Sequence, residues 1–161
     1  MSIGKPADLI AMVLEDGSCT HAAAGYDFYQ AGDIADWEKK TALVGTGQCV
    51  ALVQAASGAP LTSFWRKGPK IKPGSKKIPS GTAIATFNSK DLYANQATGN
   101  HAAIFVSVDA NGIVVVDQWA SLKAPARRTL KFRGGKGSAS NDGDQFSVIV
   151  TQKIQNHPDK K

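Results

Sequence analysis

The second half of this 161-residue chain is a series of short apolar runs, rich in β-branched residues and separated by polar, glycine-containing segments. Such runs are typical of β-strands. Asn111-Gly112 lies between two of them and signals a tight hairpin turn. The pattern therefore predicts consecutive antiparallel strands at about 82–87, 101–108, 113–119, 126–132 and 146–151.

The segment before these strands has the spacing of a helix. In residues 46–57, Val50 and Val53 lie three positions apart among good helix formers, and Gly58 supplies a stop signal. Weaker patterns predict short helices over 6–15 and 31–40. The pattern of residues 16–44 is otherwise mixed. We expect a long loop at 59–80, a loop at 88–100 that frames one side of a cleft, and a mobile loop at 133–144.

A helix followed by antiparallel strands predicts an α+β fold with its helices on one side. The length and the 42% hydrophobic content are ordinary for one compact domain over 1–161. It divides into an N-terminal part (1–44), a core (45–151) and a polar tail (152–161). No apolar run is long enough to span a membrane, and the first residues lack the pattern of a secretory signal.

The chain has a formal net charge of +6, and its basic residues gather in two groups. Basic groups attract anionic partners such as cell-wall carboxylates, acidic lipids or nucleic acid, although solvated loops also carry them. Since no signature of a nucleic-acid-binding module accompanies them, we expect no nucleic-acid partner. The two groups are Arg66, Lys67, Lys70, Lys72, Lys76 and Lys77, and Arg127, Arg128, Lys131, Arg133 and Lys136.

Cys49 stands at the start of the predicted helix 46–57. There, unpaired backbone N–H groups and the positive end of the helix dipole lower a thiol pKa and favour the reactive thiolate. The same N–H groups can hold a developing oxyanion. A buried cysteine that acts only as a small hydrophobic residue is the competing interpretation.

A cysteine nucleophile needs a base, and the base needs an orienting partner. His101 opens one predicted strand, and Asp117 and Gln118 end the next. An antiparallel hairpin brings these two ends together. Asp117 and Gln118 point to opposite faces of a strand, so only one of them is expected to address His101, and either an acid or an amide can orient an imidazole.

Other cysteine and histidine residues are weaker candidates. Cys19 lies two positions before His21, but no second pair of ligands stands at metal-binding spacing, so we expect no metal site. His157 lies next to Pro158 in the polar tail. Two cysteines, Cys19 and Cys49, do not make a disulfide framework.

Taken in order, Gly47-Gln48-Cys49 opening a helix and Asn100-His101 opening a strand resemble the CHAP and NlpC-type amidase and peptidase superfamily of papain-like cysteine hydrolases. The chain is most similar to a small bacterial branch that includes amidase effectors of type VI secretion systems. The resemblance covers about residues 45–150. Its closer features lie at 47–54, 59–60, 65–66, 81–87, 98–103 and 117–119.

The resemblance implies a papain-like fold, in which the nucleophile helix packs on an antiparallel β-sheet or half-barrel. It implies the catalytic residues Cys49, His101 and Asp117, no metal or organic cofactor, and the stem peptide of peptidoglycan as substrate. Either the bond between D-glutamate and diaminopimelate or that between muramic acid and L-alanine is a candidate. Further candidates are Gln48 and Gln118 for oxyanion binding or orientation, and Trp65, Asn100 and Trp119 for substrate contacts; the tryptophans are also typical of core packing.

The same resemblance suggests an antibacterial toxin. Such a toxin is made in the cytoplasm without a signal peptide, delivered by components of a type VI apparatus and active in the periplasm of a target bacterium. It normally has a cognate immunity protein. The alternatives are a phage-borne or lysis-associated amidase, and a non-enzymatic basic binding domain in which Cys49 and His101 are core residues.

Overall fold

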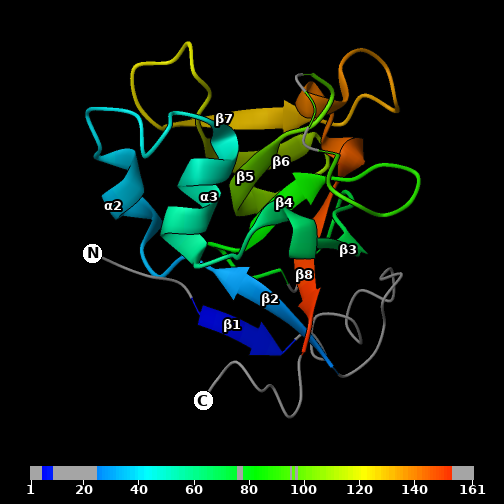
Figure 1. Ribbon diagram of the computed structural model, residues 1–161. Helices are drawn as coiled ribbons and strands as arrows, with labels where there is room; N and C mark the ends of the chain where they lie inside the picture. Colours follow the sequence, from blue (N-terminus) through cyan, green and yellow to red (C-terminus); the bar gives the residue numbers. More distant parts are fainter. Residues whose placement is uncertain (1–4, 9–24, 76–77, 95, 97, 154–161) are drawn as a thin grey trace.

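The computed structural model describes residues 5–8, 25–75, 78–94, 96 and 98–153. These residues form an eight-stranded sheet with its longest helix on one face (Figure 1). The elements are β1 (Lys5–Asp8), β2 (Tyr26–Gln30), α2 (Ile34–Glu38), α3 (Cys49–Ser57), η1 (Thr62–Phe64), β3 (Arg66–Lys70), β4 (Ala83–Thr86), β5 (Ala102–Val108), β6 (Gly112–Asp117), β7 (Ala126–Lys131), η2 (Ala139–Asn141), η3 (Gly143–Gln145) and β8 (Phe146–Gln152).

The sheet follows the order β1-β2-β8-β4-β5-β6-β7, and β3 also pairs with β8. Every strand pairing in it is antiparallel. The five strands predicted from the sequence are present as β4 to β8, and the α+β class is confirmed. The hairpin β5–β6, which turns at Asn111-Gly112, joins consecutive neighbours as expected.

The two faces of the sheet carry separate cores, because successive side chains of a strand point to opposite sides. On one face, α3 packs with Leu52 and Val53 over the small residues Ala83, Ala85 and Ala102. Small side chains there let the helix approach the strands closely. The other face holds larger side chains of the same strands, among them Ile84, Phe105, Val115, Phe146 and Val148.

Three expectations from the sequence need correction. The helix predicted over 6–15 is wrong at its start, because Lys5–Asp8 is a strand paired with β2, and residues 9–15 lie outside the described part. The loop predicted at 59–80 contains β3. Strand β2 lies in the segment 16–44, for which the sequence pattern is mixed. The weak helix at 31–40 is present only as α2.

The missed strand β3 has the sequence Arg-Lys-Gly-Pro-Lys, which carries no strand-like hydrophobic pattern. Its place comes from a close approach to β8. A side chain at Gly68 would meet the backbone oxygen of Val148 at 2.7 Å. A glycine therefore lets the two strands lie together, and the pairing depends on β8 rather than on the strand's own residues.

The segment 133–144 was expected to be a mobile loop, and in the structure it is organised around one buried carboxylate. Asp142 accepts hydrogen bonds from the backbone N–H groups of Arg133, Gly135 and Asp144. These bonds lower the pKa of Asp142 although burial opposes ionisation. The short helices η2 and η3 follow from this arrangement.

None of the helices in the described residues has the length and apolar character needed to cross a membrane.

Candidate active site

The nucleophile candidate lies at the first residue of α3. The chain turns into the helix through Gly45 and Gly47, whose φ angles of 57° and 88° favour glycine. Gln48 is the N-cap residue, and Cys49 follows it with its side chain half-buried. The predicted helix is thus present from Cys49, and it ends at Gly58 in the left-handed conformation.

Gln118 fixes this helix start to the sheet. Its side-chain amide donates to the backbone oxygens of Val44 and Gln48 at 2.9 and 2.8 Å. Its side-chain oxygen accepts from the Val44 N–H at 2.8 Å. Gln118 is fully buried, so its hydrogen bonds are protected from water. Its amide is used in holding the backbone before Cys49, and it does not contact His101.

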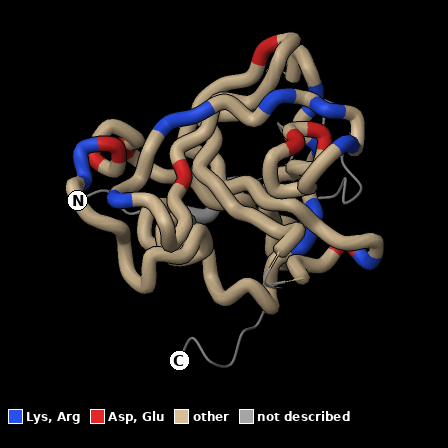
Figure 2. The backbone as a smooth tube through the Cα atoms, turned by 90° about the horizontal axis from the view of Figure 1, so that it is seen from above, with Lys and Arg blue, Asp and Glu red and all other residues tan. Residues whose placement is uncertain are grey.

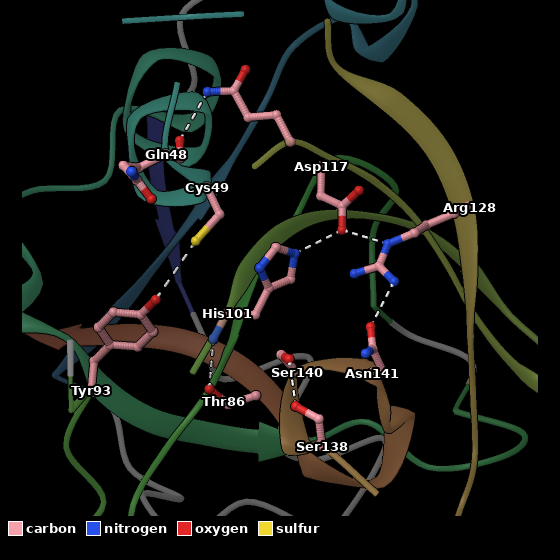
Figure 3. A network of polar contacts seen from close by, with 11 residues as sticks. Gln48, Cys49, Thr86, Tyr93, His101, Asp117, Arg128, Ser138, Ser140 and Asn141 are labelled. Carbon is pink, nitrogen blue, oxygen red and sulfur yellow. Dashed lines mark hydrogen bonds and ion pairs between the residues drawn. The ribbon is translucent and has the colours of Figure 1, made fainter. Parts of the chain in front are cut away.

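His101 and Asp117 form a buried pair at the end of the sheet. His101 Nε2 lies 2.7 Å from Asp117 Oδ2, and the exposed fractions of the two side chains are 7% and 0%. The other ring nitrogen lies on the side of Cys49 (Figure 3). The His101 backbone N–H donates to Thr86 Oγ1 at 3.0 Å, which fixes the start of β5.

Strand register explains why Asp117 rather than Gln118 meets His101. In the β5–β6 hairpin, Ile104 pairs with Val116. Continued by three residues, this register places His101 opposite Trp119 and diagonal to Asp117 on the same face. Gln118 points to the opposite face, towards α3. The hairpin argument from sequence thus predicted the neighbours correctly, and the side-chain contact singles out the acid.

Arg128 is a fourth member of this cluster that the sequence analysis placed only in a basic group. Its Nε donates to Asp117 Oδ2 at 2.8 Å, and its Nη1 donates to Asn141 Oδ1 at 3.0 Å. Its guanidinium carbon lies 4.9 Å from the ring centroid of Trp119. Because β7 pairs Arg128 with Val115, its side chain shares the face of Asp117. A long-range strand pairing places it there, and no local motif signals it.

Tyr93 is the second residue that the sequence did not reveal. Its hydroxyl lies 3.8 Å from Cys49 Sγ. Asn100 Nδ2 donates to the same hydroxyl oxygen at 3.3 Å, which leaves the hydroxyl hydrogen free to point at the sulfur. Tyr93 lies in the segment 88–100, which was expected to frame one side of a cleft and does flank Cys49 (Figure 3).

The electrostatics favour a thiolate–imidazolium pair. Burial opposes ionisation of Cys49, but the hydrogen bond and charge of His101, with the Ala102 N–H and the Tyr93 hydroxyl, lower its pKa overall. Burial also opposes the charged form of His101, but the hydrogen bonds to Asp117 and Cys49 raise its pKa to about 9. Burial and the nearby Cys49 charge raise the pKa of Tyr93, which therefore remains a donor.

A pocket of about 420 Å³ opens beside the imidazole. Its walls come from the loop before β5, the end of β6, β7 and the segment around η2. It contains no carboxylate among its lining residues, which are Thr98, Gly99, Asn100, His101, Trp119, Arg128, Ser138, Ser140 and Asn141.

The other residues proposed from the sequence lie as follows. Gln48 is exposed, and its side chain makes no capping hydrogen bond. Trp65 is fully buried in the core against Tyr93, and its Nε1 donates to the Pro60 oxygen, so it does not face solvent. Asn100 and Trp119 both line the pocket. Cys19, His21 and His157 lie outside the described residues.

In the part of the chain that the structure describes, no group of three or more His, Cys, Asp or Glu side chains is arranged to hold a metal ion. The cluster at the sheet end instead has the parts of a nucleophilic site: a thiol, a base beside it, and a carboxylate behind the base.

Comparison with known proteins agrees with this geometry. The chain is 39% identical over 98 residues to the type VI secretion amidase effector 2 protein of Salmonella typhi, covering 60% of this chain and 72% of that protein. It is also 39% identical over 105 residues to domesticated amidase effector 2 of Ixodes scapularis, covering 63% of this chain and 70% of that one.

A solved structure of type 6 secretion amidase effector 2 (Tae2) superposes with a TM-score of 0.65 at 29% identity, covering 80% of this chain and 98% of that structure. This confirms the predicted papain-like fold and the likeness to type VI amidase effectors. The family description of domesticated amidase effector 2 (Dae2) matches residues 25–149. The chain therefore belongs to the Dae2 family of amidase effectors.

Proposed function

We propose that this protein is a cysteine amidase that hydrolyses an amide bond in the stem peptide of peptidoglycan, and that Cys49, His101 and Asp117 carry the reaction. One observation supports the proposal most strongly. Asp117 holds His101 by one ring nitrogen at 2.7 Å, and the other ring nitrogen lies on the side of Cys49 at the start of α3. Together with the family of amidase effectors, this arrangement supports hydrolysis through a thiolate.

In the first half of the reaction, the Cys49 thiolate attacks the carbonyl carbon of the scissile amide. The C–S bond forms as the carbonyl electron pair moves onto oxygen. His101, protonated at the nitrogen facing Cys49, then gives its proton to the leaving nitrogen as the C–N bond breaks. The product is a thioester and a free amine.

In the second half, water attacks the thioester. His101, now neutral, takes a proton from the water, and the C–S bond breaks to release the carboxylic acid and restore the thiolate. Asp117 keeps Nε2 as the proton-bearing nitrogen and supports the imidazolium formed in this step. Arg128 Nε donates to Asp117 Oδ2 at 2.8 Å and holds this carboxylate in place behind the imidazole.

Two donors are available for the oxyanion. The backbone N–H of Cys49 lies in the first turn of α3, where amides lack helical partners. The Tyr93 hydroxyl, close to Cys49 Sγ and fixed by Asn100, is the second. It replaces Gln48 as the better candidate, because the Gln48 side chain is exposed. Such preorganised donors stabilise the charge that develops in the transition state.

The family also suggests how the enzyme meets its substrate. The Salmonella relative is a type VI secretion effector. We propose that this chain is a secreted antibacterial toxin that acts on the cell wall of a target bacterium, and that the producing cell protects itself with a cognate immunity protein. Such a protein would cover Cys49 and the pocket beside His101.

Digestion of purified sacculi, followed by mass analysis of the released fragments, tests both the activity and the bond. We expect wild-type protein to release fragments with one new carboxyl and one new amine terminus. Cys49→Ala should abolish release while its circular dichroism spectrum is unchanged, and Cys19→Ala, which removes the other thiol, should keep most of the activity.

His101→Ala should be as damaging as Cys49→Ala, and the double variant should be little worse than either, because the two residues act as one unit. Near-wild-type activity of Cys49→Ala would eliminate the cysteine mechanism. Rapid alkylation of Cys49 near neutral pH separates this proposal from a non-enzymatic binding domain, in which the thiol would react slowly.

A further inference from the structure

The pocket beside His101 is lined by polar and basic side chains, most of which have no part in the hydrolytic steps. We propose that it is a subsite for a carboxylate group of the substrate, and that Arg128 recognises this carboxylate. The inference rests on the proposed peptidoglycan amidase function and specifies which part of the substrate the site reads.

The side chains that line the pocket favour an anionic ligand. Its lining includes one guanidinium and one imidazole together with hydroxyl and amide side chains, and it includes no acidic residue. Asp117 lies directly behind the pocket, but it is fully buried and both cations share its Oδ2 atom. One carboxylate thus faces two cations when His101 is protonated.

These charges stay balanced during the reaction. With a Cys49 thiolate, the two cations face two anions in the free enzyme, and in the tetrahedral intermediate the negative charge of the sulfur has moved onto the substrate oxygen. In the thioester the sulfur carries no charge, and His101 has given its proton to the leaving amine. A carboxylate in the pocket is therefore bound by Arg128 and by neutral donors at every stage, and its binding does not depend on a charge that the reaction creates.

Arg128 is held in place to bind such a group. Its Nε is fixed by Asp117, its Nη1 by Asn141, and its guanidinium carbon lies over the Trp119 ring. Within the part of the chain that the structure describes, Nη2 takes part in no hydrogen bond, and the side chain is 27% exposed. In Figure 3 the terminal nitrogen that is not bonded to Asn141 points towards the side of His101 and Ser140. A fixed guanidinium loses little freedom on binding a carboxylate.

The wall of the pocket around η2 adds hydroxyl donors. Ser138 Oγ and Ser140 Oγ lie 2.8 Å apart, and both residues line the pocket. One hydroxyl donates to the other, so the hydrogen of the acceptor hydroxyl is free to donate to a ligand. Asp142 organises the turn that carries them through its three backbone hydrogen bonds. The two serines are therefore held in place by the fold of this segment.

The ligand class follows from the substrate. A peptidoglycan stem peptide presents free carboxylates on D-glutamate and on diaminopimelate, next to the amide bonds that an amidase cuts. A volume of about 420 Å³ accommodates one amino-acid residue with its carboxylate. In Figure 2 several blue segments follow one another along the upper part of the view, and the formal net charge of the chain is +6, so the protein as a whole also favours an anion.

The experiment changes the charge on the substrate and on the protein separately. Defined muropeptides are used in a free form and in forms where one carboxylate at a time, that of D-glutamate or of diaminopimelate, is converted to a carboxamide. For wild-type protein we expect one of these amidations to lower kcat/KM about tenfold, the effect of one charge-assisted hydrogen bond.

Arg128→Gln should lower kcat/KM for every substrate, because Arg128 also positions Asp117, and it should bring the ratio between free and amidated substrate close to one. Arg128→Lys, which keeps the charge, should restore part of the ratio. Arg127→Gln is the matched control: it removes the same charge one residue away, where the side chain is bonded to Glu38 instead, and the ratio should stay at its wild-type value.

Binding measured by calorimetry in a Cys49→Ala background gives a readout that does not depend on turnover. There, amidation of the same carboxylate should weaken binding, and Ser140→Ala should reduce that effect. Equal binding of free and amidated muropeptide, or a ratio that survives in Arg128→Gln, overturns the subsite. Absence of hydrolysis by wild-type protein, with binding still sensitive to amidation, overturns the proposed reaction and leaves the subsite supported.

Discussion

The two faces of the sheet at the end of β6 use neighbouring residues for different tasks. On one face Asp117 shares an oxygen between His101 and Arg128, in a cluster of charged groups. On the other face Gln118, a neutral residue, bonds only to the backbone of Val44 and Gln48 at the start of α3. Both residues are fully buried.

The comparison shows that the end of β6 has two separate roles, one on each face of the sheet. The charged face raises the pKa of His101, the proposed base. The neutral face fixes the backbone that precedes Cys49, the proposed nucleophile. A charge on the second face would gain nothing, since its partners are neutral carbonyl and amide groups and its burial would be costly. Variants at the two positions should therefore fail in different ways.

The largest expected effect is on catalysis by the charged face. Asp117→Ala should lower kcat about 10³-fold, because His101 loses the group that fixes its tautomer and supports its charge. The loss should be less complete than that of Cys49→Ala, since Asp117 orients the base but forms no bond to the substrate. Kinetics on a defined muropeptide measure it. A variant that keeps a tenth of the wild-type kcat would contradict the assignment of Asp117.

The second largest effect is expected at Tyr93, the proposed oxyanion donor. Tyr93→Phe removes one hydroxyl and keeps the ring that packs against Trp65. We expect kcat to fall about 10²-fold with little change in KM, which is the signature of a contact made in the transition state. Gln48→Ala is the control and should cost little. If Gln48→Ala proves the more harmful of the two, the side-chain donor is Gln48.

Substitution of Gln118 on the neutral face should mainly lower the stability of the protein. Gln118→Ala removes the partner of the Val44 N–H and one of the two donors to each of the Val44 and Gln48 backbone oxygens, so we expect a loss of about 2–4 kcal/mol in the free energy of unfolding. Urea denaturation measures this loss. In the folded fraction kcat should fall about tenfold through misplacement of Cys49. An unchanged midpoint would show that the helix start does not depend on this residue.

The smallest expected difference between variants of the two faces is in the pH dependence of turnover. The pKa of His101 is raised to about 9, so the protonated form that serves the leaving amine is present below that pH and lost above it. Turnover should therefore fall as pH rises through about 9, whereas alkylation of the Cys49 thiolate should not fall there.

Because the hydrogen bond from Asp117 raises this pKa, Asp117→Asn should move the alkaline limb of the rate profile to lower pH. Gln118→Ala should leave the limb where it is, since Gln118 does not contact the imidazole. A limb that moves equally in both variants would mean that it reports the fold and not the base.

Much of the fold could be predicted from the sequence because it depends on local patterns. Helix α3 has its glycine turn and its glycine stop within a dozen residues, and β4, β5, β6 and β8 carry their own apolar runs. The hairpin β5–β6 also placed His101 and Asp117 as neighbours. By contrast, β3 and β2 form through pairing with β8, over 75 and 120 residues away along the chain, so their own residues carry little of the signal.

The sequence by itself determined the helix that begins at Cys49, the positions of strands β4 to β8 along the chain and the candidates Cys49 and His101, because patterns within short segments indicate each of these. Only the tertiary structure decided that Asp117 rather than Gln118 meets His101, that Tyr93 reaches Cys49, and that Arg128 completes the cluster. The physical reason is that these contacts depend on which strand edges pair and in which register. Register is fixed when the whole core is packed, and no single segment of the chain specifies it.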